Sequence, residues 1–331
     1  MKNVTYEWER NFLSEKAFLS ENTKGREHPN KSCPFRTDFQ RDSDRIIHSK
    51  AFRRLMHKMQ VFVAPEGDHY RTRLTHTLEV NRIARTLARS MRLNEDLADA
   101  ASLGHDLGHT PFGHSGERVL DMLSTNGFAH YKHSIRVVDK LENGGKGLNL
   151  TYEVKDAILN HTGEGKAETL EGGLIKLADR IAYINHDIDD SIRAGIIKNS
   201  DIPKDISDIL GNTHGERINS MVKSVIEFGT NKGFVGFTEP YGSATMELRS
   251  FLFERVYRNP TAKSEDKKVE MMMSALYDHY RKNIDFLPDE YKQFLEEDGV
   301  NQVVCDFLAG MTDRYAIALF EEIFVPKSWQ R

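Results

Sequence analysis

The sequence predicts an all-α fold, and three observations lead to that prediction. Apolar residues recur at the spacing of helical turns over most of the 331-residue chain. Runs in which apolar and polar residues alternate, as they do in half-buried strands, are few and short. Hydrophobic residues form 39% of the chain and charged residues 29%, which is enough apolar material for one large core under a charged surface.

The first part of the chain contains the clearest helix patterns. Apolar residues from Leu74 to Met91 recur on one helical face and mark one helix. Asn94 is suited to cap the next helix, which should end at Gly108 and so carry His105 and Asp106 at its C-terminal end. Further helices, separated by glycine-rich or polar stretches, are expected at 43–60, 114–124, 132–142, 151–160 and 173–193.

Beyond about residue 200 the chain has long helical patterns and no motif that we can match to a chemical task. Helices are expected there at 204–228, 242–258, 262–285 and 299–324. The segment 232–237 could instead form a short strand or a hairpin arm. We therefore expect a core over residues 1–200 and a helical extension over residues 201–331, packed on the core, with a role in oligomerisation or regulation.

Charge and cysteine content narrow the class of protein. The formal net charge of -4 at pH 7 argues against a partner nucleic acid and favours a small anion. Cys33 and Cys305 are the only cysteines and lie far apart, which argues against a disulfide framework and a CxxC zinc site. No apolar run approaches the roughly 20 residues of a membrane span, and the N-terminus lacks the apolar stretch of a signal peptide. We expect a cytoplasmic protein with no membrane partner.

Histidine is unevenly distributed along the chain. Eleven of the 14 histidines lie within residues 48–186, and the densest stretch spans residues 105–117. Imidazole nitrogens and carboxylate oxygens are suitable ligands for a catalytic divalent ion. Three expected helices could converge on a single ion, and the predicted metal ligands on them are His76, His105, Asp106 and Asp179.

A histidine, a His-Asp pair and a later aspartate on separate helices resemble the HD-domain superfamily of metal phosphohydrolases. Within that superfamily, three segments in the expected order resemble the dGTPase-like deoxynucleoside triphosphate triphosphohydrolases. These are QRDSDRIIHSKAFRRL at 40–55, KMQVF at 58–62 and HDLGHTPFGHSGE at 105–117. The resemblance covers roughly residues 33–190 and implies an HD-type core whose metal motif spans residues 73–187.

The resemblance implies a specific reaction on a deoxynucleoside triphosphate. Water attacks the α-phosphorus, and the products are the deoxynucleoside and intact inorganic triphosphate. One divalent metal ion is expected as the cofactor; Mn, Mg, Fe, Ni and Zn are not distinguishable from the sequence, and we favour Mn or Mg. Such an ion can supply a nucleophile at neutral pH without a serine or cysteine.

Further residues acquire roles by matching the family's motifs. His114 is the expected proton donor to the leaving oxygen, and Glu117 lies three residues later, on the same helix face, where it could fix the tautomer of His114 and raise its pKa. The residues expected to bind substrate are Arg73 and Arg180 at the phosphates, His109 and His130 along the triphosphate path, and Gln60, Tyr183 and Asp187 at the sugar.

The helix that carries Asp179 has a spacing that suits this assignment. Asp179, Tyr183 and Asp187 follow each other at intervals of four residues, so they drift only slightly around one helical face. A tyrosine ring against the sugar edge would disfavour a 2′-hydroxyl. A half-buried core tyrosine is the alternative for Tyr183, and for His161 we expect a helix-capping role.

Two segments depart from the family pattern. Relatives usually read His-Asn-x-Gln-Ser where this chain has His130-Tyr-Lys-His-Ser, and Glu-Tyr-Lys-Thr where it has Met56-His-Lys-Met. The base preference of the dGTP-specific family members therefore cannot be assigned to this chain. The resemblance also implies a homo-oligomer and allows an activating nucleotide, although the chain is shorter than many relatives that have regulatory sites.

Two other functions stay open at this stage. The first is an HD phosphohydrolase that acts on a nucleoside monophosphate or a signalling nucleotide. The second is a protein that senses nucleotides or binds nucleic acid with little activity, although all four predicted metal ligands and the pair His114 and Glu117 are present.

Overall fold

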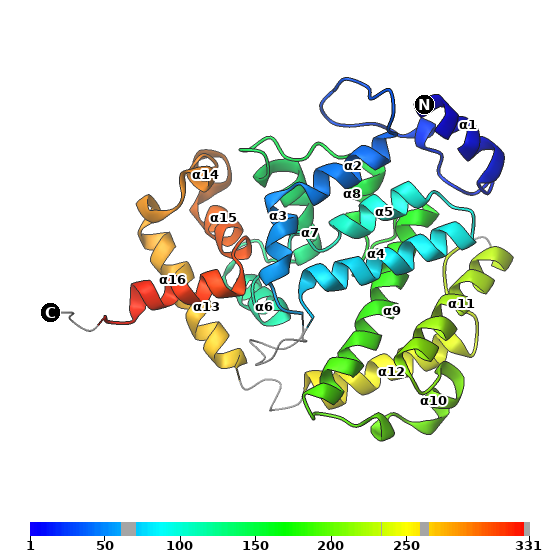
Figure 1. The fold of residues 1–331 in the computed structure, drawn as a ribbon. Coiled ribbons are helices and arrows are strands. Elements are labelled where there is room, and N and C mark those ends of the chain that lie inside the picture. Colours follow the sequence, from blue (N-terminus) through cyan, green and yellow to red (C-terminus); the bar gives the residue numbers. More distant parts are fainter. Residues whose placement is uncertain (61–70, 233, 259–264, 328–331) are drawn as a thin grey trace. The chain divides into compact units, whose positions relative to one another are not determined.

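In the computed structural model, which describes residues 1–60, 71–232, 234–258 and 265–327, the chain is built from helices (Figure 1). No strand occurs among these residues, and the only β-type pairings there are isolated bridges, Arg26 with Thr151 and Met59 with Thr72. The prediction of an all-α fold is confirmed. Residues 234–238 form no regular element, so the alternative of a strand near this point is not supported. None of the described helices is both long and apolar enough to cross a membrane.

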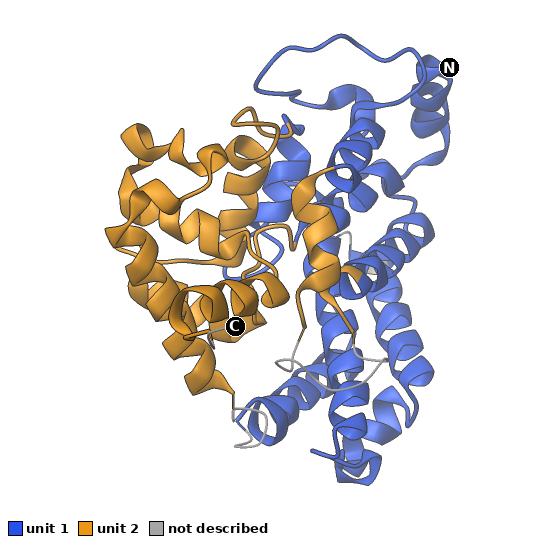
Figure 2. Cartoon of the chain, turned by 60° about the vertical axis from the view of Figure 1, so that its left-hand side comes forward, with its two compact units in different colours: residues 1–48, 75–105, 149–263 blue, residues 49–74, 106–148, 264–331 orange. Residues whose placement is uncertain are grey.

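The chain divides into two compact units, each made of three separate segments (Figure 2). Unit 1 comprises residues 1–48, 75–105 and 149–263, and unit 2 comprises residues 49–74, 106–148 and 264–331. The predicted boundary at residue 200 falls inside the third segment of unit 1. The functional division proposed for residues 1–200 and 201–331 stays a prediction.

Unit 1 is organised around its longest helix. That helix, α9, packs against α5, α8, α11 and α12, while α2 packs against α5. Their apolar stripes are buried in the unit, as the helical periodicity requires. The helices of unit 1 are α1 (Lys2–Phe12), α2 (Asp38–Ile47), α4 (Arg73–Ser90), α5 (Glu95–Gly104), α8 (Tyr152–Leu159), α9 (Leu170–Arg193), α10 (Lys204–Leu210), α11 (His214–Lys232) and α12 (Tyr241–Leu252). The first two residues of α4 belong to unit 2.

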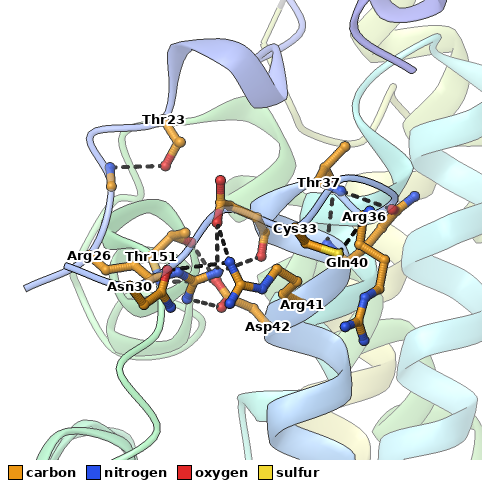
Figure 3. A network of polar contacts seen from close by, with 12 residues as sticks. Thr23, Arg26, Asn30, Cys33, Arg36, Thr37, Gln40, Arg41, Asp42 and Thr151 are labelled. Carbon is orange, nitrogen blue, oxygen red and sulfur yellow. Dashed lines mark hydrogen bonds and ion pairs between the residues drawn. The ribbon is translucent and has the colours of Figure 1, made fainter. Parts of the chain in front are cut away.

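Polar side chains fix where several of these helices begin. Asn94 accepts hydrogen bonds from the backbone N–H groups of the second and third residues of α5, which confirms the predicted N-cap. Helix α5 ends at Gly104 rather than at Gly108, so His105 lies just beyond its last turn. Thr37 and Gln40 form a capping box at the start of α2, beside a buried Arg26 that pairs with Asp42 (Figure 3).

Unit 2 has its own apolar core. Helix α13 packs against α6, α15 and α16, and buried residues of these helices such as Leu120, Leu276 and Leu308 form one cluster. Helix α7 continues into a π-helical turn, Val137–Leu141. The helices of unit 2 are α3 (Lys50–Arg54), α6 (Gly113–Leu123), α7 (His130–Arg136), α13 (Asp266–Lys282), α14 (Asp289–Lys292), α15 (Leu295–Ala309) and α16 (Asp313–Phe324).

Three predicted helices are each two helices in the structure. The helix expected at 204–228 is interrupted at Gly211, whose φ of 106° is not helical. The helix expected at 299–324 ends at Ala309, and Thr312 caps a new one by accepting from the N–H of Tyr315. Ser49 likewise caps a new helix inside the range 43–60. Periodicity missed these breaks because apolar residues are buried on both sides of each.

Candidate functional site

Five side chains gather in unit 1, and we call them the His76 cluster: His76 of α4, His105 after α5, His161 after α8, and Asp179 and His186 of α9. Nε2 of His76 lies 3.2 Å from Oδ1 of Asp179, and its Nδ1 lies 2.8 Å from Nε2 of His186. The ring centroids of His76 and His105 are 5.5 Å apart, and those of His105 and His161 are 5.1 Å apart. The structure therefore brings together three of the four predicted metal ligands within one unit.

Backbone carbonyl groups set the orientation of two of these rings. Nδ1 of His105 lies 2.7 Å from the carbonyl oxygen of Ser102, and Nδ1 of His161 lies 2.7 Å from that of Ile158. A carbonyl oxygen can only accept, so both imidazoles carry a proton on Nδ1, and Nε2 is the nitrogen that could bind a metal ion. The capping contact expected for His161 is present, and the same ring also faces His105.

Asp179 stays ionised in this environment. Burial raises the pKa of a carboxyl group, but the hydrogen bond from His76 and the nearby imidazoles of His105 and His161 lower the pKa of Asp179 to about 2. Two ligand atoms bound about 2.1 Å from one ion at a right angle lie about 3 Å apart. The separation of 3.2 Å between His76 and Asp179 fits that arrangement. The residues of unit 1 thus suit a divalent metal ion.

Asp106, the fourth predicted ligand, is joined to His105 by a peptide bond and belongs to unit 2. There it pairs with Arg73, whose Nη1 lies 2.9 Å from Oδ2 of Asp106, and both side chains are buried. His109 and His130 stack with ring centroids 4.1 Å apart. Single ligand atoms of Asp106, His109 and His130 lie within 4.8 Å of one another. With His114 and Glu117 these residues form what we call the Glu117 cluster: Arg73, Asp106, His109, His114, Glu117 and His130.

Glu117 joins two histidines in this cluster. Its Oε2 lies 3.2 Å from Nδ1 of His114, and its Oε1 lies 2.8 Å from both Nδ1 and the backbone N of His130. Burial raises the pKa of Glu117, but the hydrogen bonds from His114 and His130 outweigh it and hold that pKa well below its usual range. The side chain of His114 is 73% exposed, so its free ring nitrogen is open to solvent.

The loop before α6 adopts an unusual backbone conformation that brings these residues together. Phe112 and Gly113 both have positive φ, 60° and 56°. A Cβ on Gly113 would lie 3.0 Å from the carbonyl oxygen of Gln60 and 3.3 Å from Nη2 of Arg73, so the lack of a side chain permits this approach. Burial, together with Arg73 and His130, holds the pKa of His109 well below its usual value and keeps the ring neutral.

The residues predicted to face the sugar have partners that the sequence did not suggest. The hydroxyl of Tyr183 accepts a hydrogen bond from Nε of Arg249, 2.9 Å away, and the hydroxyl of Tyr257 donates to the carboxylate of Asp187. Asp187 is buried and Tyr183 is half-buried. Arg180 lies against Met246, with Nη1 3.7 Å from the sulfur. In unit 2, Gln60 is half-buried beside Gly113.

Four residues near these positions were not among the predicted site residues: His161, His186, Arg249 and Tyr257. His186 lies seven residues after Asp179, two turns along the same helix, and that spacing could have identified it. Arg249 and Tyr257 follow about 66 and 70 residues after their partners and belong to no motif, so no local signal pointed to them.

Comparison with known families agrees with this geometry. Residues 73–184 match the HD domain, and residues 235–322 match the phosphohydrolase-associated domain. HD domains bind divalent metals, and the His76 cluster offers nitrogen and oxygen ligands of the required kind. The fold and the site therefore define an HD-domain phosphohydrolase.

Three curated relatives are similar over nearly their whole length, and each is named deoxyguanosinetriphosphate triphosphohydrolase-like protein. The relative from Caldanaerobacter subterraneus subsp. tengcongensis is 54% identical over 99% of this chain and 97% of its own. The relative from Clostridium tetani is 50% identical over 93% of this chain and 91% of its own. The relative from Clostridium perfringens is 47% identical over 97% of this chain and 96% of its own. The chain belongs to the deoxyguanosinetriphosphate triphosphohydrolase-like family.

Proposed function

We propose that the protein hydrolyses deoxynucleoside triphosphates to the deoxynucleoside and inorganic triphosphate. The observation that carries this proposal is the His76 cluster, in which two imidazoles and an ionised carboxylate from three helical segments meet in a buried part of an HD domain. The relatives' names suggest the nucleotide class. Base preference is left open.

One divalent ion, Mn or Mg in preference to Fe, Ni or Zn, would be held by His76, His105, Asp106 and Asp179. Asp106 is included because it directly follows His105 in the chain and completes the His-Asp pair. When bound, such an ion lowers the pKa of a coordinated water and polarises a phosphoryl oxygen. His186 would hold the ring of His76 in place from the other side through its contact with Nδ1.

His114 would protonate the 5′-oxygen of the leaving nucleoside as the bond to the α-phosphorus breaks. Its Nδ1 faces Glu117 and its other nitrogen is exposed, which is the arrangement that a proton donor needs. The carboxylate of Glu117 contacts Nδ1 of His114 and so fixes the orientation of the ring. Water that attacks the phosphorus from the opposite side completes the displacement, and no covalent intermediate is needed.

The remaining predicted residues would bind substrate. Arg73 and Arg180 would contact phosphate oxygens, and fixed cations stabilise the charge that develops there. His109 is kept neutral by burial, so it would serve as a hydrogen-bonding wall of the triphosphate path rather than as a charge. Beside it His130 would complete that wall, while Gln60, Tyr183 and Asp187 would face the sugar.

Identification of the products tests the proposal. Purified protein is incubated with Mn²⁺ or Mg²⁺ and a panel of dNTPs, NTPs and dNMPs, and the phosphate-containing product is separated by ion chromatography. Triphosphate from dNTPs alone is the expected result. Pyrophosphate or orthophosphate would contradict the mechanism, turnover of dNMPs would favour another HD phosphohydrolase activity, and no turnover would favour a nucleotide sensor.

The proposal extends to partners and location. We expect a homo-oligomer in the cytoplasm, with an activating nucleotide as a second ligand and residues 201–331 involved in assembly or regulation. Sedimentation with and without dNTPs tests the assembly, and a monomer under both conditions would contradict it.

A further inference from the structure

Two buried residues of unit 2 with ionisable side chains lie next to the Glu117 cluster and have no role in the proposed reaction. Lys58 is 2% exposed and Asp313 is 6% exposed. A buried polar or charged group lowers stability unless it is hydrogen-bonded, so each side chain must be compensated by its contacts. Both residues connect the same three segments: residues 58–60, the loop 109–112, and the turn 309–313 between α15 and α16.

Asp313 bridges two backbone N–H groups with its two carboxylate oxygens. Oδ1 accepts from the N–H of Phe112 and Oδ2 accepts from the N–H of Met59, each at 3.0 Å. Phe112 is the residue with positive φ immediately before α6, and Met59 immediately precedes Gln60. Without Asp313, both N–H groups would need another acceptor, and the contact at Phe112 is buried.

Lys58 ties the same segments together through carbonyl groups. Its Nζ donates to the carbonyl oxygens of His109 and Ala309, the latter at 2.8 Å. Its own carbonyl oxygen accepts from the N–H of Arg73 at 2.9 Å. Lys58 therefore holds the backbone of His109 and of Arg73, and Asp313 holds the backbone at Phe112, two residues before His114.

We propose that Lys58 and Asp313 are positioning residues that hold the loop 109–113 in its catalytic conformation, and that the turn 309–313 thereby contributes to the active site from the C-terminal part of the chain. This inference rests on the proposed function. The loop's backbone places His109 and starts the helix of His114 and Glu117, while the segment at 59–60 places Gln60. None of these contacts touches the His76 cluster of unit 1.

Asp313→Asn tests the inference with little change in volume. The amide keeps one oxygen acceptor but turns an NH₂ group toward the other backbone N–H, so one of the two bridging bonds is lost. Loss of about one ångström in alignment lowers the rate on the order of 100-fold. We expect a fall in kcat of that order, a small change in KM, and an unchanged affinity for Mn²⁺ by calorimetry. Lys58→Met should act in the same direction.

Amide hydrogen exchange provides a readout that needs no substrate. In Asp313→Asn, exchange should accelerate in peptides that cover residues 57–60 and 105–117, and remain as in the unmodified protein elsewhere in unit 2. Asp289→Asn, which alters an aspartate on α14 whose side chain is 96% exposed, is the matched control and should change neither kcat nor exchange. If no dNTP is hydrolysed by the unmodified protein, the exchange experiment still tests the positioning.

Two outcomes would overturn the inference. One is wild-type kcat and wild-type exchange in Asp313→Asn. The other is faster exchange throughout unit 2 with kcat per folded molecule unchanged, which would mean that Asp313 only stabilises the fold. Asp313→Ala removes both bonds and is the stronger variant, but Asp313→Asn decides the question because it is the one expected to fold.

Discussion

The His76 cluster and the Glu117 cluster use the same residue types in different ways. In unit 1 the imidazoles of His105 and His161 are fixed by backbone carbonyl groups at Nδ1, so Nε2 is the nitrogen that could bind a metal ion. In unit 2 the charged groups pair with one another, Arg73 with Asp106 and Glu117 with two histidines. We propose that His105, whose Nδ1 meets a carbonyl oxygen, serves as a metal ligand, and that His114, whose Nδ1 meets a carboxylate, serves as a proton donor.

The largest effect should follow from loss of a metal ligand. Asp106→Ala removes a proposed carboxylate ligand, and activity and Mn²⁺ affinity should both fall by at least about 100-fold. Isothermal titration with Mn²⁺ and triphosphate release measure the two effects. Unchanged activity would show that Asp106 is not a metal ligand.

A smaller effect, confined to turnover, is expected from the proton donor. His114→Ala should lower kcat about 100- to 1000-fold because the leaving oxygen would lose its proposed acid, while Mn²⁺ affinity stays the same. Glu117→Gln should lower kcat less, since His114 remains. Steady-state kinetics with calorimetry on the same preparations checks both variants. A loss of Mn²⁺ affinity in His114→Ala would contradict the assignment of metal binding and proton donation to different clusters.

Removal of His186, the partner of His76, should lower the affinity for Mn²⁺ rather than turnover. His186→Ala leaves the four proposed ligands in place but removes the contact at 2.8 Å that orients His76. Mn²⁺ affinity should fall about 10- to 100-fold, as is typical for such supporting residues. Saturating Mn²⁺ should restore most of the activity. Wild-type affinity in this variant would rule out a supporting role for His186.

The smallest expected effect concerns stability and pH. The folded state lowers the pKa of Glu117 below that of the unfolded chain, so the unfolded chain binds more protons as the pH falls through about 4.5. The contribution of Glu117 is complete above that pH and decreases below it, by up to about 1.4 kcal/mol per pH unit. Urea unfolding measures the free energies of unfolding of the unmodified protein and of Glu117→Gln. The difference between the two should decrease as the pH is lowered from 7 to 3. A constant difference would contradict the assigned contact.

Local sequence signals predicted the helices and several contacts of the site well. Asn94 caps α5 as its amide chemistry suggests, and His114 and Glu117 meet because three residues separate them on one helix. The ends of helices were less predictable. Apolar periodicity continued across Gly211 and across residues 310–312, because both neighbouring helices bury apolar faces.

Contacts between distant segments were beyond local signals. Tyr257 meets Asp187 and Arg249 meets Tyr183 only because α12 and the turn after it pack beside α9. Asp313 lies 254 residues from Met59, and the bond between them depends on how the whole of unit 2 folds. A sequence motif identifies side chains within one short segment, whereas contacts between distant segments depend on tertiary packing.

The alternation of the two units along the chain has a consequence for how such a protein can be changed. The backbone crosses from one unit to the other at residues 48–49, 74–75, 105–106, 148–149 and 263–264. A truncation after residue 200 would remove α10, α11 and α12 from unit 1 and α13 to α16 from unit 2. Neither unit corresponds to one continuous stretch of gene, so neither can be deleted, exchanged or recombined as a single block.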